Sequence, residues 1–351
     1  MQTLNIALVG AGLVGQDHLR MIADNQDCQL VAIVDPTEAA RSQAAELNVA
    51  YFNDLPLLLA QTQQIGGIDG IILATPNQLH ADQAKQCIAA GIPAIIEKPV
   101  TESVAAGQEL LELAANSNVP MMVGHHRMHS PIMRVAKQAI SDGRLGALVA
   151  VNGSAMFYKP DDYFAAGPWR TQPGGGPILI NLIHERGNLC YLCGDITSVQ
   201  AVASNARRGF VVEDTVGILL TFDSGVIGTF ILSDTAVSGR SWEQTSQENP
   251  YFASTPDEDC YHLAGTKGAL SIPTLRYKHY GASASSWNEP FLYDTIALAR
   301  RDPLAEQLAH FCQVIRGEVD PLVSVHDGLQ NLRVTEAIVA AAESGERVTL
   351  S

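Results

Sequence analysis

A lysine that directly follows a short apolar segment is the first residue to which we assign chemistry. Lys98 lies in Glu97-Lys98-Pro99, after the strand-like residues 94–96. At the carboxyl end of a strand it would face whatever ligand that edge of the sheet binds. There it can donate a hydrogen bond to a reacting oxygen and stabilise developing negative charge. The alternative is a surface lysine that happens to follow a strand.

The N-terminal residues predict the ligand at that edge. An apolar strand over 6–9 leads into Gly10-Ala11-Gly12-Leu13-Val14-Gly15 and then a helical pattern. The first glycine permits a tight turn, the second lets the backbone approach a diphosphate, and the third lets helix and strand pack closely. The first N–H groups of the helix would face the phosphates. We therefore expect a dinucleotide to be bound by Gly10, Gly12, Leu13, Val14 and Gly15.

An acid stands where such a dinucleotide would need one. Asp35 follows Gly15 by 20 residues and ends a second apolar run, 30–34. An acid there accepts hydrogen bonds from the adenine ribose hydroxyls and repels a 2′-phosphate. Arg41 is the nearby cation that could counter this preference. We expect NAD as the cofactor, favoured over NADP.

The first third of the chain alternates strand-like and helix-like segments, which predicts a doubly wound parallel sheet. The predicted strands are 6–9, 30–34, 50–52, 71–74, 94–96 and 121–123. The predicted helices are one after the glycine loop, 38–47, one capped by Asp54, 79–90 ending at Gly91, and 103–115. Because ligands bind such sheets at the carboxyl ends of the strands, Asp35, Thr75-Pro76 and Glu97-Lys98 should lie at one edge.

From about residue 148 the pattern changes to long strands. Asp223-Ser224-Gly225 separates the strand-like runs 214–222 and 226–233, which predicts a hairpin. A second hairpin is predicted over 261–272, and two helices over 303–316 and 326–344. The polar stretch 238–259 is expected to be a long loop that covers a site or an interface. We predict a Rossmann domain over 1–123 and an α+β domain with a large, mostly antiparallel open sheet over 124–351.

Composition narrows the class of protein. The 351 residues carry a net charge of −15, which argues against nucleic acid or an anionic membrane as partner. No apolar run is long enough to span a membrane, and no secretory signal opens the chain. Six scattered cysteines fit a reducing cytoplasm rather than a disulfide framework. The Cys190–Cys193 pair has metal-site spacing but no second pair, so core packing is favoured and no metal site is expected.

Taken together, these motifs resemble the glucose–fructose oxidoreductase and inositol dehydrogenase family (Gfo/Idh/MocA) over essentially the whole chain. The residues that carry the resemblance are the glycine loop with Asp35, Ala74-Thr75-Pro76-Asn77 with His80, Glu97-Lys98-Pro99, Gly124 with Arg127 and Pro131, Trp169-Arg170 before Gly174-Gly175-Gly176, and His184. It implies oxidation of a secondary alcohol on a sugar, cyclitol or related ring. It also implies a homodimer or homotetramer formed through the outer face of the second sheet.

The resemblance also suggests the cofactor contacts beyond the glycine loop. They are Asp35, Thr75, Pro76, Asn77, His80, Glu97, Lys98 and Arg127. The catalytic residues it implies are Lys98 and His184, with His184 as the base whose ordinary pKa of roughly 6.5 suits proton transfer near neutral pH. A buried histidine bonded to the backbone is the alternative for His184.

One position departs from the family pattern. Most members carry an aspartate four residues before the histidine, where this chain has Ile180. Asn181 is polar and, three residues before His184, shares its face on a helix. Asn181 could orient His184 but cannot supply a negative charge, so either the histidine works with a neutral partner or a carboxylate comes from elsewhere.

Cations and aromatic rings are frequent in the loops expected to bind substrate. His125-His126-Arg127, His129, Lys159 and Arg186 accompany Tyr158. The expected substrate contacts are Lys98, His126, Tyr163, Trp169, Arg170, Asn181 and His184. Rings suit the apolar face of a sugar and cations suit hydroxyls or a carboxylate, which favours a hydroxylated ring that can carry an acid group. The alternative is that these cations pair with Asp161, Asp162 and Glu185.

Two further functions compete with the dehydrogenase. Some relatives are glycoside hydrolases that oxidise and re-reduce the sugar within one turnover, and these release no net NADH. Others bind the cofactor but have lost catalysis and act as regulators. Ile180 slightly favours the regulator, whereas Lys98 and His184 argue against it.

Overall fold

Six parallel strands form the first sheet of the computed structural model, which describes residues 2–350. They are β1 (Leu4–Val9), β2 (Cys28–Val34), β3 (Ala50–Phe52), β4 (Gly70–Leu73), β5 (Ala94–Ile96) and β6 (Met121–Val123). Their order is β3-β2-β1-β4-β5-β6, so the direction of winding reverses between β1 and β4. Ile71, Ile72 and Leu73 are all buried, as expected of a parallel strand covered on both faces. The predicted doubly wound sheet is confirmed.

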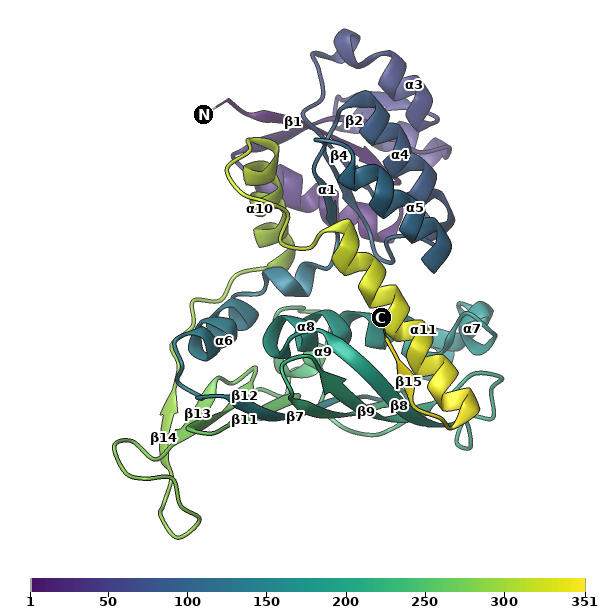
Figure 1. Cartoon of the computed structure of the whole chain (residues 1–351). Helices are drawn as coiled ribbons and strands as arrows, with labels where there is room; N and C mark the ends of the chain where they lie inside the picture. The colour runs from purple at the N-terminus through teal and green to yellow at the C-terminus, as the bar shows by residue number, and fades with distance from the viewer. Residues whose placement is uncertain (1, 351) are drawn as a thin grey trace. The chain divides into compact units, whose positions relative to one another are not determined.

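Helices cover both faces of this sheet (Figure 1). They are α1 (Leu13–Asp24), α2 (Glu38–Glu46), α3 (Leu55–Ala60), α4 (His80–Ala90), α5 (Val104–Ala115) and α10 (Pro303–Ile315). Alternate residues of β1 separate the two layers. Ile6 and Leu8 pack with α1, α2 and α10, whereas Ala7 and Val9 pack with α3, α4 and α5. As predicted, Asp54 caps α3 by accepting the N–H of Leu57 at 2.9 Å.

The chain divides into two compact units in a way that differs from the predicted boundary at 123/124. The first unit consists of residues 1–129 and 303–332, and the second of 130–302 and 333–351. The segment 303–332 returns to the first unit because α10 supplies part of one helical layer. Phe311 is fully buried there, and a Cβ on Gly70 of β4 would lie 2.9 Å from its ring. The division falls within the long helix α11 (Val325–Ser344).

Nine strands form the sheet of the second unit. They are β7 (Leu148–Met156), β8 (Ile196–Ser204), β9 (Thr215–Phe222), β10 (Ile227–Ser233), β11 (Tyr261–Gly265), β12 (Gly268–Ile272), β13 (Arg276–His279), β14 (Leu292–Thr295) and β15 (Val348–Thr349). Their order is β14-β13-β12-β11-β7-β10-β9-β8-β15. Within this second sheet, only the β10–β7 pairing is parallel among the described residues. Both predicted hairpins, β9–β10 and β11–β12, are present.

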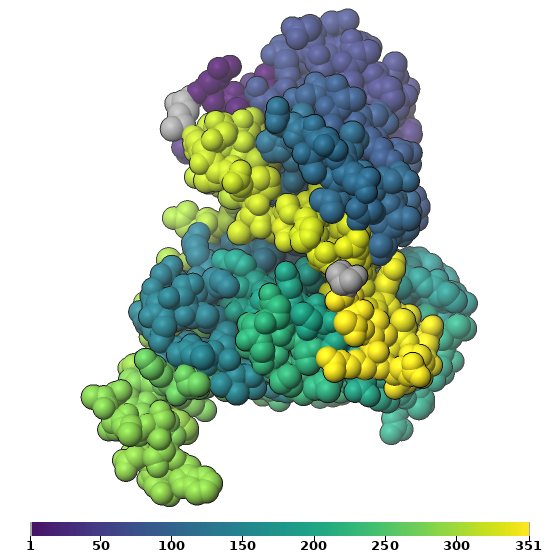
Figure 2. Space-filling model, in the orientation of Figure 1, coloured from purple at the N-terminus to yellow at the C-terminus, as the bar shows by residue number. Residues whose placement is uncertain are grey.

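One face of the nine-stranded sheet is covered by helices α6 (Pro131–Ser141), α8 (Ile183–Cys193) and the second half of α11. Ile218, Leu220 and Phe230 point toward that layer. The opposite face retains exposed apolar side chains, including Val202 and Leu219. Figure 2 shows the loop between β13 and β14 extending from this unit as a light-green lobe.

The polar stretch predicted as a loop holds a buried helical turn. The short helix α9 (Trp242–Thr245) begins after Ser241, whose side chain accepts the N–H of Gln244. Trp242 is only 3% exposed, because its ring packs against Tyr261 with centroids 5.9 Å apart. One large aromatic residue therefore anchors a segment whose average composition indicates a loop.

Candidate functional site

The loop between β1 and α1 leaves space beside backbone N–H groups. Gly10 has φ +95°, and a Cβ there would lie 2.5 Å from the carbonyl oxygen of Ala74. A Cβ on Gly15 would overlap the carbonyl oxygen of Gly10, whereas one on Gly12 would meet no described atom within 4 Å. Among residues 2–350, no side chain caps α1 and its first turn has no acid, so this terminus suits a diphosphate. Leu13, which begins the helix, is 87% exposed.

Asp35 is fixed beside this loop, at the carboxyl end of β2. One carboxylate oxygen accepts the backbone N–H of Ala11 at 2.9 Å. The other accepts the backbone N–H and the hydroxyl of Thr37 at 2.9 and 2.6 Å. Partial burial favours the neutral acid, but the hydrogen bonds outweigh it and hold the pKa of Asp35 below its usual value. Asp35 is thus an ionised acceptor next to the glycine loop.

Arg41, the cation nearest to Asp35 in sequence, contacts other groups. Its guanidinium carbon lies 5.0 Å from the ring centroid of Tyr51, and its Nε lies 3.6 Å from the carboxylate of Glu38. The hydroxyl of Tyr51 donates to the carbonyl oxygen of Asp35 at 2.8 Å. These contacts favour NAD, because they direct Arg41 to a neighbouring acid and ring.

The loop after β4 is tied to the turn after β5 by one buried histidine. His80 lies with its two ring nitrogens 2.8 Å from the carbonyl oxygens of Thr75 and Pro99. The hydroxyl of Thr75 donates to Gln83 at 2.6 Å. Pro76 and Asn77 continue this loop into the 3₁₀ turn η2 (Asn77–Leu79), where no side chain among residues 2–350 forms a cap. The His80 side chain therefore holds the loop in place through the backbone carbonyl oxygens of Thr75 and Pro99.

Glu97 anchors the segment that carries Lys98. Its carboxylate lies 2.9 Å from the ring nitrogen of His18 in α1, and its second oxygen accepts the backbone N–H of Lys98 at 3.2 Å. Burial favours the neutral acid, but His18, Lys98 and His126 outweigh it and lower the pKa of Glu97 to about 2. A Cβ on Gly124 would lie 2.7 Å from this carboxylate, which explains the glycine there. The Lys98–Pro99 peptide bond is cis, and Lys98 itself is half-buried.

Three histidines follow β6, around the 3₁₀ turn η3 (His126–His129). His125 is buried and lies 3.0 Å from the side-chain nitrogen of Asn331. Arg127 is also buried, and His126 is half-buried. Burial lowers the pKa of His129 to about 3, so this histidine is neutral at physiological pH. Within residues 2–350 no group of three or more metal-ligating side chains comes together.

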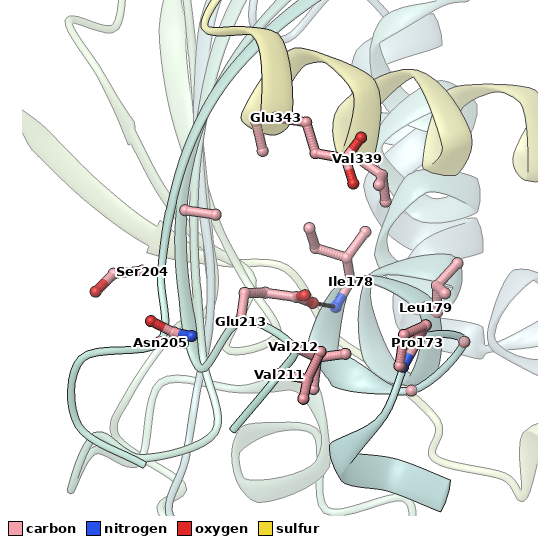
Figure 3. A pocket seen from close by; sticks show the side chains of 14 residues that line it. Pro173, Ile178, Leu179, Ser204, Asn205, Val211, Val212, Glu213, Val339 and Glu343 are labelled. Carbon is pink, nitrogen blue, oxygen red and sulfur yellow. Dashed lines mark hydrogen bonds between the residues drawn. The ribbon is translucent and has the colours of Figure 1, made fainter. Parts of the chain in front are cut away.

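In the second unit, a glutamate fixes the glycine-rich segment that precedes His184. The carboxylate of Glu213 accepts the backbone N–H of Ile178 at 2.8 Å, and a Cβ on Gly176 would lie 2.6 Å from it. Burial raises the pKa of Glu213. Figure 3 shows this contact in a pocket of about 450 Å³, with Val339 and Glu343 of α11 across from it. The pocket lining does not include Lys159, Asn181 or His184.

The segment from Ile178 to Leu182 forms a π-turn, η5, rather than the regular helix expected there. Such wide turns are rare and are frequent at functional sites. The following helix α8 begins at Ile183, so His184 lies in its first turn and is half-buried. Ile180 and Asn181 both lie in the π-turn and are half-buried.

Asn181 is bonded to a buried lysine. Its side-chain oxygen accepts a hydrogen bond of 2.7 Å from the ammonium of Lys159, which follows β7 and is 9% exposed. Lys159 also lies 3.8 Å from Asp234 at the end of β10. Burial outweighs the attraction of Asp234 and lowers the pKa of Lys159 to about 8. Burial likewise raises the pKa of Asp234, although Arg208 contacts that carboxylate at 2.8 Å.

Aromatic residues of the short helices α7 (Asp161–Ala165) and η4 (Pro168–Thr171) adjoin this lysine. The Tyr163 ring centroid lies 4.9 Å from the ammonium of Lys159 and 3.9 Å from the guanidinium carbon of Arg170. Arg170 also donates a hydrogen bond to the carbonyl oxygen of Tyr163. Trp169 is 56% exposed, and its ring lies 5.6 Å from Arg170.

The predicted residues thus gather in two places. In the first unit the glycine loop, Asp35, His80, Glu97 and Lys98 lie along the carboxyl edge of one sheet, as the sequence predicts. In the second unit Tyr163, Arg170 and Asn181 gather around Lys159. Sequence reasoning did not find four of their supporting residues, namely His18, Glu213, Arg208 and Asp234. Asp161, one of the acids considered as alternative partners for the loop cations, lies 3.8 Å from Arg208, which was not among those cations, and Glu185 accepts the hydroxyl of Tyr261.

Family models match both parts of the chain. A model described as an oxidoreductase family with an NAD-binding Rossmann fold, GFO/IDH/MocA, matches residues 4–125. A model of the GFO/IDH/MocA C-terminal domain matches residues 133–271. Together they span more than half of the sequence.

Individual proteins match over nearly their full length. Inositol 2-dehydrogenase of Rhizobium meliloti (strain 1021) is 24% identical, covering 99% of this chain and 100% of the relative. The NAD⁺-dependent scyllo-inositol 2-dehydrogenase of Bacillus subtilis (strain 168) is 24% identical, covering 98% and 95%. The crystal structure of an oxidoreductase from Agrobacterium radiobacter in complex with NAD⁺, L-tartaric acid and magnesium is similar with a TM-score of 0.80. It is 19% identical and covers 99% of this chain and 98% of that one.

Proposed function

Since the chain belongs to the GFO/IDH/MocA family of oxidoreductases, we propose that it transfers a hydride between NAD and a secondary alcohol of a sugar, cyclitol or related hydroxylated ring. The observation that carries this proposal is the carboxyl edge of the first sheet. Three features follow strands of a single sheet at this edge. Gly12, with open space where a Cβ would lie, follows β1; the ionised Asp35 follows β2; and a lysine anchored by buried Glu97 follows β5. A dinucleotide-binding site beside a lysine held in a fixed position suits alcohol oxidation.

The ionised side chain of Asp35 is the reason that NAD is favoured over NADP. An ionised carboxylate accepts hydrogen bonds from ribose hydroxyls and repels a 2′-phosphate. Its two oxygens are held in place by Ala11 and Thr37, so it cannot turn away to admit the phosphate at low cost. Arg41 pairs with Glu38 rather than supplying a ready phosphate contact. The remaining proposed contacts are Leu13, Val14, Thr75, Pro76, Asn77, His80 and Arg127.

In the oxidation, a bound nicotinamide would accept the hydride from the substrate carbon. Lys98 donates a hydrogen bond to the substrate oxygen and stabilises negative charge as the carbon–hydrogen bond breaks. His184 accepts the hydroxyl proton, so that the alcohol becomes a carbonyl. In the reverse direction His184 returns the proton. Asn181 faces Lys159 through its oxygen, and Ile180 stands where most members of the family carry an aspartate.

The substrate class rests on the relatives. The matched proteins of R. meliloti and B. subtilis are inositol dehydrogenases, whose substrates are cyclitols. The A. radiobacter structure contains L-tartaric acid, a hydroxy acid. We extend this chemistry to the present chain as a hydroxylated ring that can carry an acid group, contacted by His126, Tyr163, Trp169 and Arg170.

A homodimer or homotetramer is proposed on the exposed apolar residues of the second unit. On the uncovered face of its sheet, Val202, Leu219 and Ile227 are 76%, 41% and 47% exposed. Burying such residues against a second copy would remove apolar area from water. A cytoplasmic location is proposed because all six cysteines are free thiols. Within residues 2–350, no helix is long and apolar enough to cross a membrane.

The test is nicotinamide absorbance at 340 nm. Purified protein and NAD⁺ would be mixed with sugars, cyclitols, sugar acids, cyclic hydroxy acids and aryl glycosides, while released aglycone is followed in parallel. NADH accumulating with one class supports the proposal and identifies the substrate type. Aglycone release without NADH would reassign the protein as a glycoside hydrolase. Bound NAD with neither product would favour a regulator.

A further inference from the structure

The buried ammonium of Lys159 has more donors than the chain satisfies. An ammonium carries three N–H donors. Among residues 2–350, the ammonium of Lys159 donates one hydrogen bond, to Asn181 at 2.7 Å, and the nearest carboxylate oxygen, from Asp234, lies 3.8 Å from it. Asp234 is already bonded to Arg208 at 2.8 Å. Lys159 therefore has donors available for a further acceptor, although it is only 9% exposed.

Arg170 also has an N–H donor that the chain does not satisfy. Its Nε is buried and has no hydrogen-bond partner among the described residues. The side chain lies flat on Tyr163, with 3.9 Å between its guanidinium carbon and the ring centroid. Lys159 contacts the same ring at 4.9 Å. Two cations with unused donors thus adjoin one aromatic ring.

The local charge favours an anion. Arg208 contacts Asp234 at 2.8 Å and Asp161 at 3.8 Å, so Asp234, which also lies 3.8 Å from Lys159, is shared between two cations. Asp161 is 95% exposed, so water screens its contribution. Burying a cation without a closely paired opposite charge is unfavourable, and such a cost is typical of a site that binds a charged ligand.

The amide of Asn181 is compatible with an anionic ligand. Because its oxygen accepts the Lys159 hydrogen bond, its NH₂ group faces away from the ammonium and offers donors. A carboxylate at this position would repel an acid, whereas a neutral amide does not. The π-turn and the carboxyl end of β7 thus present the Asn181 amide and the Lys159 ammonium as donors, with Asp234 as the nearest acid at 3.8 Å from Lys159.

We propose that Lys159 and Arg170 form a carboxylate-binding subsite, so that the preferred substrate is a sugar acid or cyclic hydroxy acid rather than a neutral polyol. This inference rests on the proposed dehydrogenase function. A carboxylate accepts from Lys159 Nζ and Arg170 Nε, while the Tyr163 ring contacts both cations. The ring that carries the carboxylate then has its hydroxyls within reach of the Asn181 amide.

Matched pairs of ligands test this subsite. D-galacturonate and D-galactose, D-glucuronate and D-glucose, and quinate and myo-inositol would be titrated calorimetrically into the protein saturated with NADH. The wild type is expected to bind at least one acid tenfold or more tightly than its neutral counterpart. Lys159→Met and Arg170→Met should each lower the affinity for that acid about tenfold or more and leave the neutral ligand within twofold.

Three further variants control for structural damage. Lys159→Arg keeps the charge and should retain most of the preference for the acid. Lys159→Gln gives a second neutral variant if Lys159→Met unfolds, as judged by circular dichroism. Lys137→Met removes another lysine that lies over a tyrosine, 5.4 Å from the ring centroid of Tyr191, and should change neither affinity.

The inference is overturned if no acid in the panel binds, if neutral ligands bind equally well, or if both neutral Lys159 variants keep the preference. Its failure can be told apart from failure of the dehydrogenase. NADH formation from neutral polyols without a preference for acids keeps the function and rejects the subsite. Tight, Lys159-dependent binding of an acid without NADH formation keeps the subsite and rejects the function.

Discussion

His18 of α1 lies with its ring nitrogen 2.9 Å from the carboxylate of Glu97, and both side chains are at least 90% buried. This contact joins the helix that follows the glycine loop to the segment that carries Lys98. The same carboxylate accepts the N–H of Lys98 and fills the space above Gly124. The cofactor loop and the proposed catalytic lysine are thus held by one buried acid.

Glu97→Gln should destabilise the protein, because it removes the charge from a buried, hydrogen-bonded pair. We expect the free energy of unfolding to fall by about 1.5–3 kcal/mol. Urea denaturation gives this value. Glu109→Gln is the matched control, since Glu109 pairs with Lys85 at 3.0 Å on the surface and should cost less than about 1 kcal/mol. Equal losses in the two variants would contradict the assigned role of Glu97.

The same acid predicts part of the pH dependence of stability. The pKa of Glu97 is about 2 in the folded chain, against an ordinary value of 4.5. Its stabilising contribution is therefore complete above pH 4.5 and is lost as the pH falls toward 2. Thermal unfolding between pH 7 and pH 3 should show a steeper decline for the wild type than for Glu97→Gln. Parallel curves would show that Glu97 titrates normally.

Gly12→Ala and Gly15→Ala should separate binding from folding. A Cβ on Gly12 projects into open space, and its φ of −69° suits alanine, so stability should change by no more than about 1 kcal/mol. The methyl group would occupy the space assigned to the diphosphate, and NAD affinity should fall at least tenfold. A Cβ on Gly15 overlaps the Gly10 carbonyl, so that variant should lose stability as well. Calorimetry with NAD and urea denaturation measure the two effects.

Lys98→Met should separate an enzyme from a cofactor-binding protein. Loss of the donor to the developing negative charge is expected to lower kcat at least 100-fold, while NAD affinity stays within a few-fold. Lys85→Met, on the surface of α4, should change neither quantity. Unchanged turnover of Lys98→Met would reject the catalytic role of this lysine.

The first sheet was predictable because its information is local. The strands β1, β2, β5 and β6 are short apolar runs, each followed by a glycine or an acid, and Asp35 stands at the spacing that a dinucleotide requires. The assignment of 303–332 was not predictable in this way. The pattern of α10 shows only that the helix needs an apolar partner, and that partner includes Gly70 and other residues more than 200 positions earlier.

For the site around Lys159, the sequence predicts which types of residue are present but not how they are arranged. The sequence shows cations and rings before the glycine-rich segment, yet it does not show which of them meet. Lys159 reaches Asn181 because β7 ends beside a π-turn, and the sequence predicts a regular helix there. Asp234 and Arg208 lie far along the chain and join Lys159 only through the order of strands in the sheet. Such contacts follow from topology.

The charge on Lys159 should lower the stability of the ligand-free protein. Its pKa is about 8 in the folded chain and 10.5 ordinarily, because burial outweighs Asp234 and Glu243, while Arg208 and Arg170 add to the lowering. Between these values the unfolded chain binds more protons than the folded one, so this residue makes stability rise from pH 8 to pH 10.5. Lys159→Met removes that rise.

At pH 7, Lys159→Met should therefore be more stable than the wild type, by about 1–3 kcal/mol, because an apolar side chain of similar length replaces an incompletely paired charge. Urea denaturation at pH 7 and pH 10 measures the difference, which should be smaller at the higher pH. Lys137→Met serves again as the control. A loss of stability at pH 7 would show that Lys159 has a structural role, whereas a gain together with weaker acid binding is the result expected of a residue retained for its ligand.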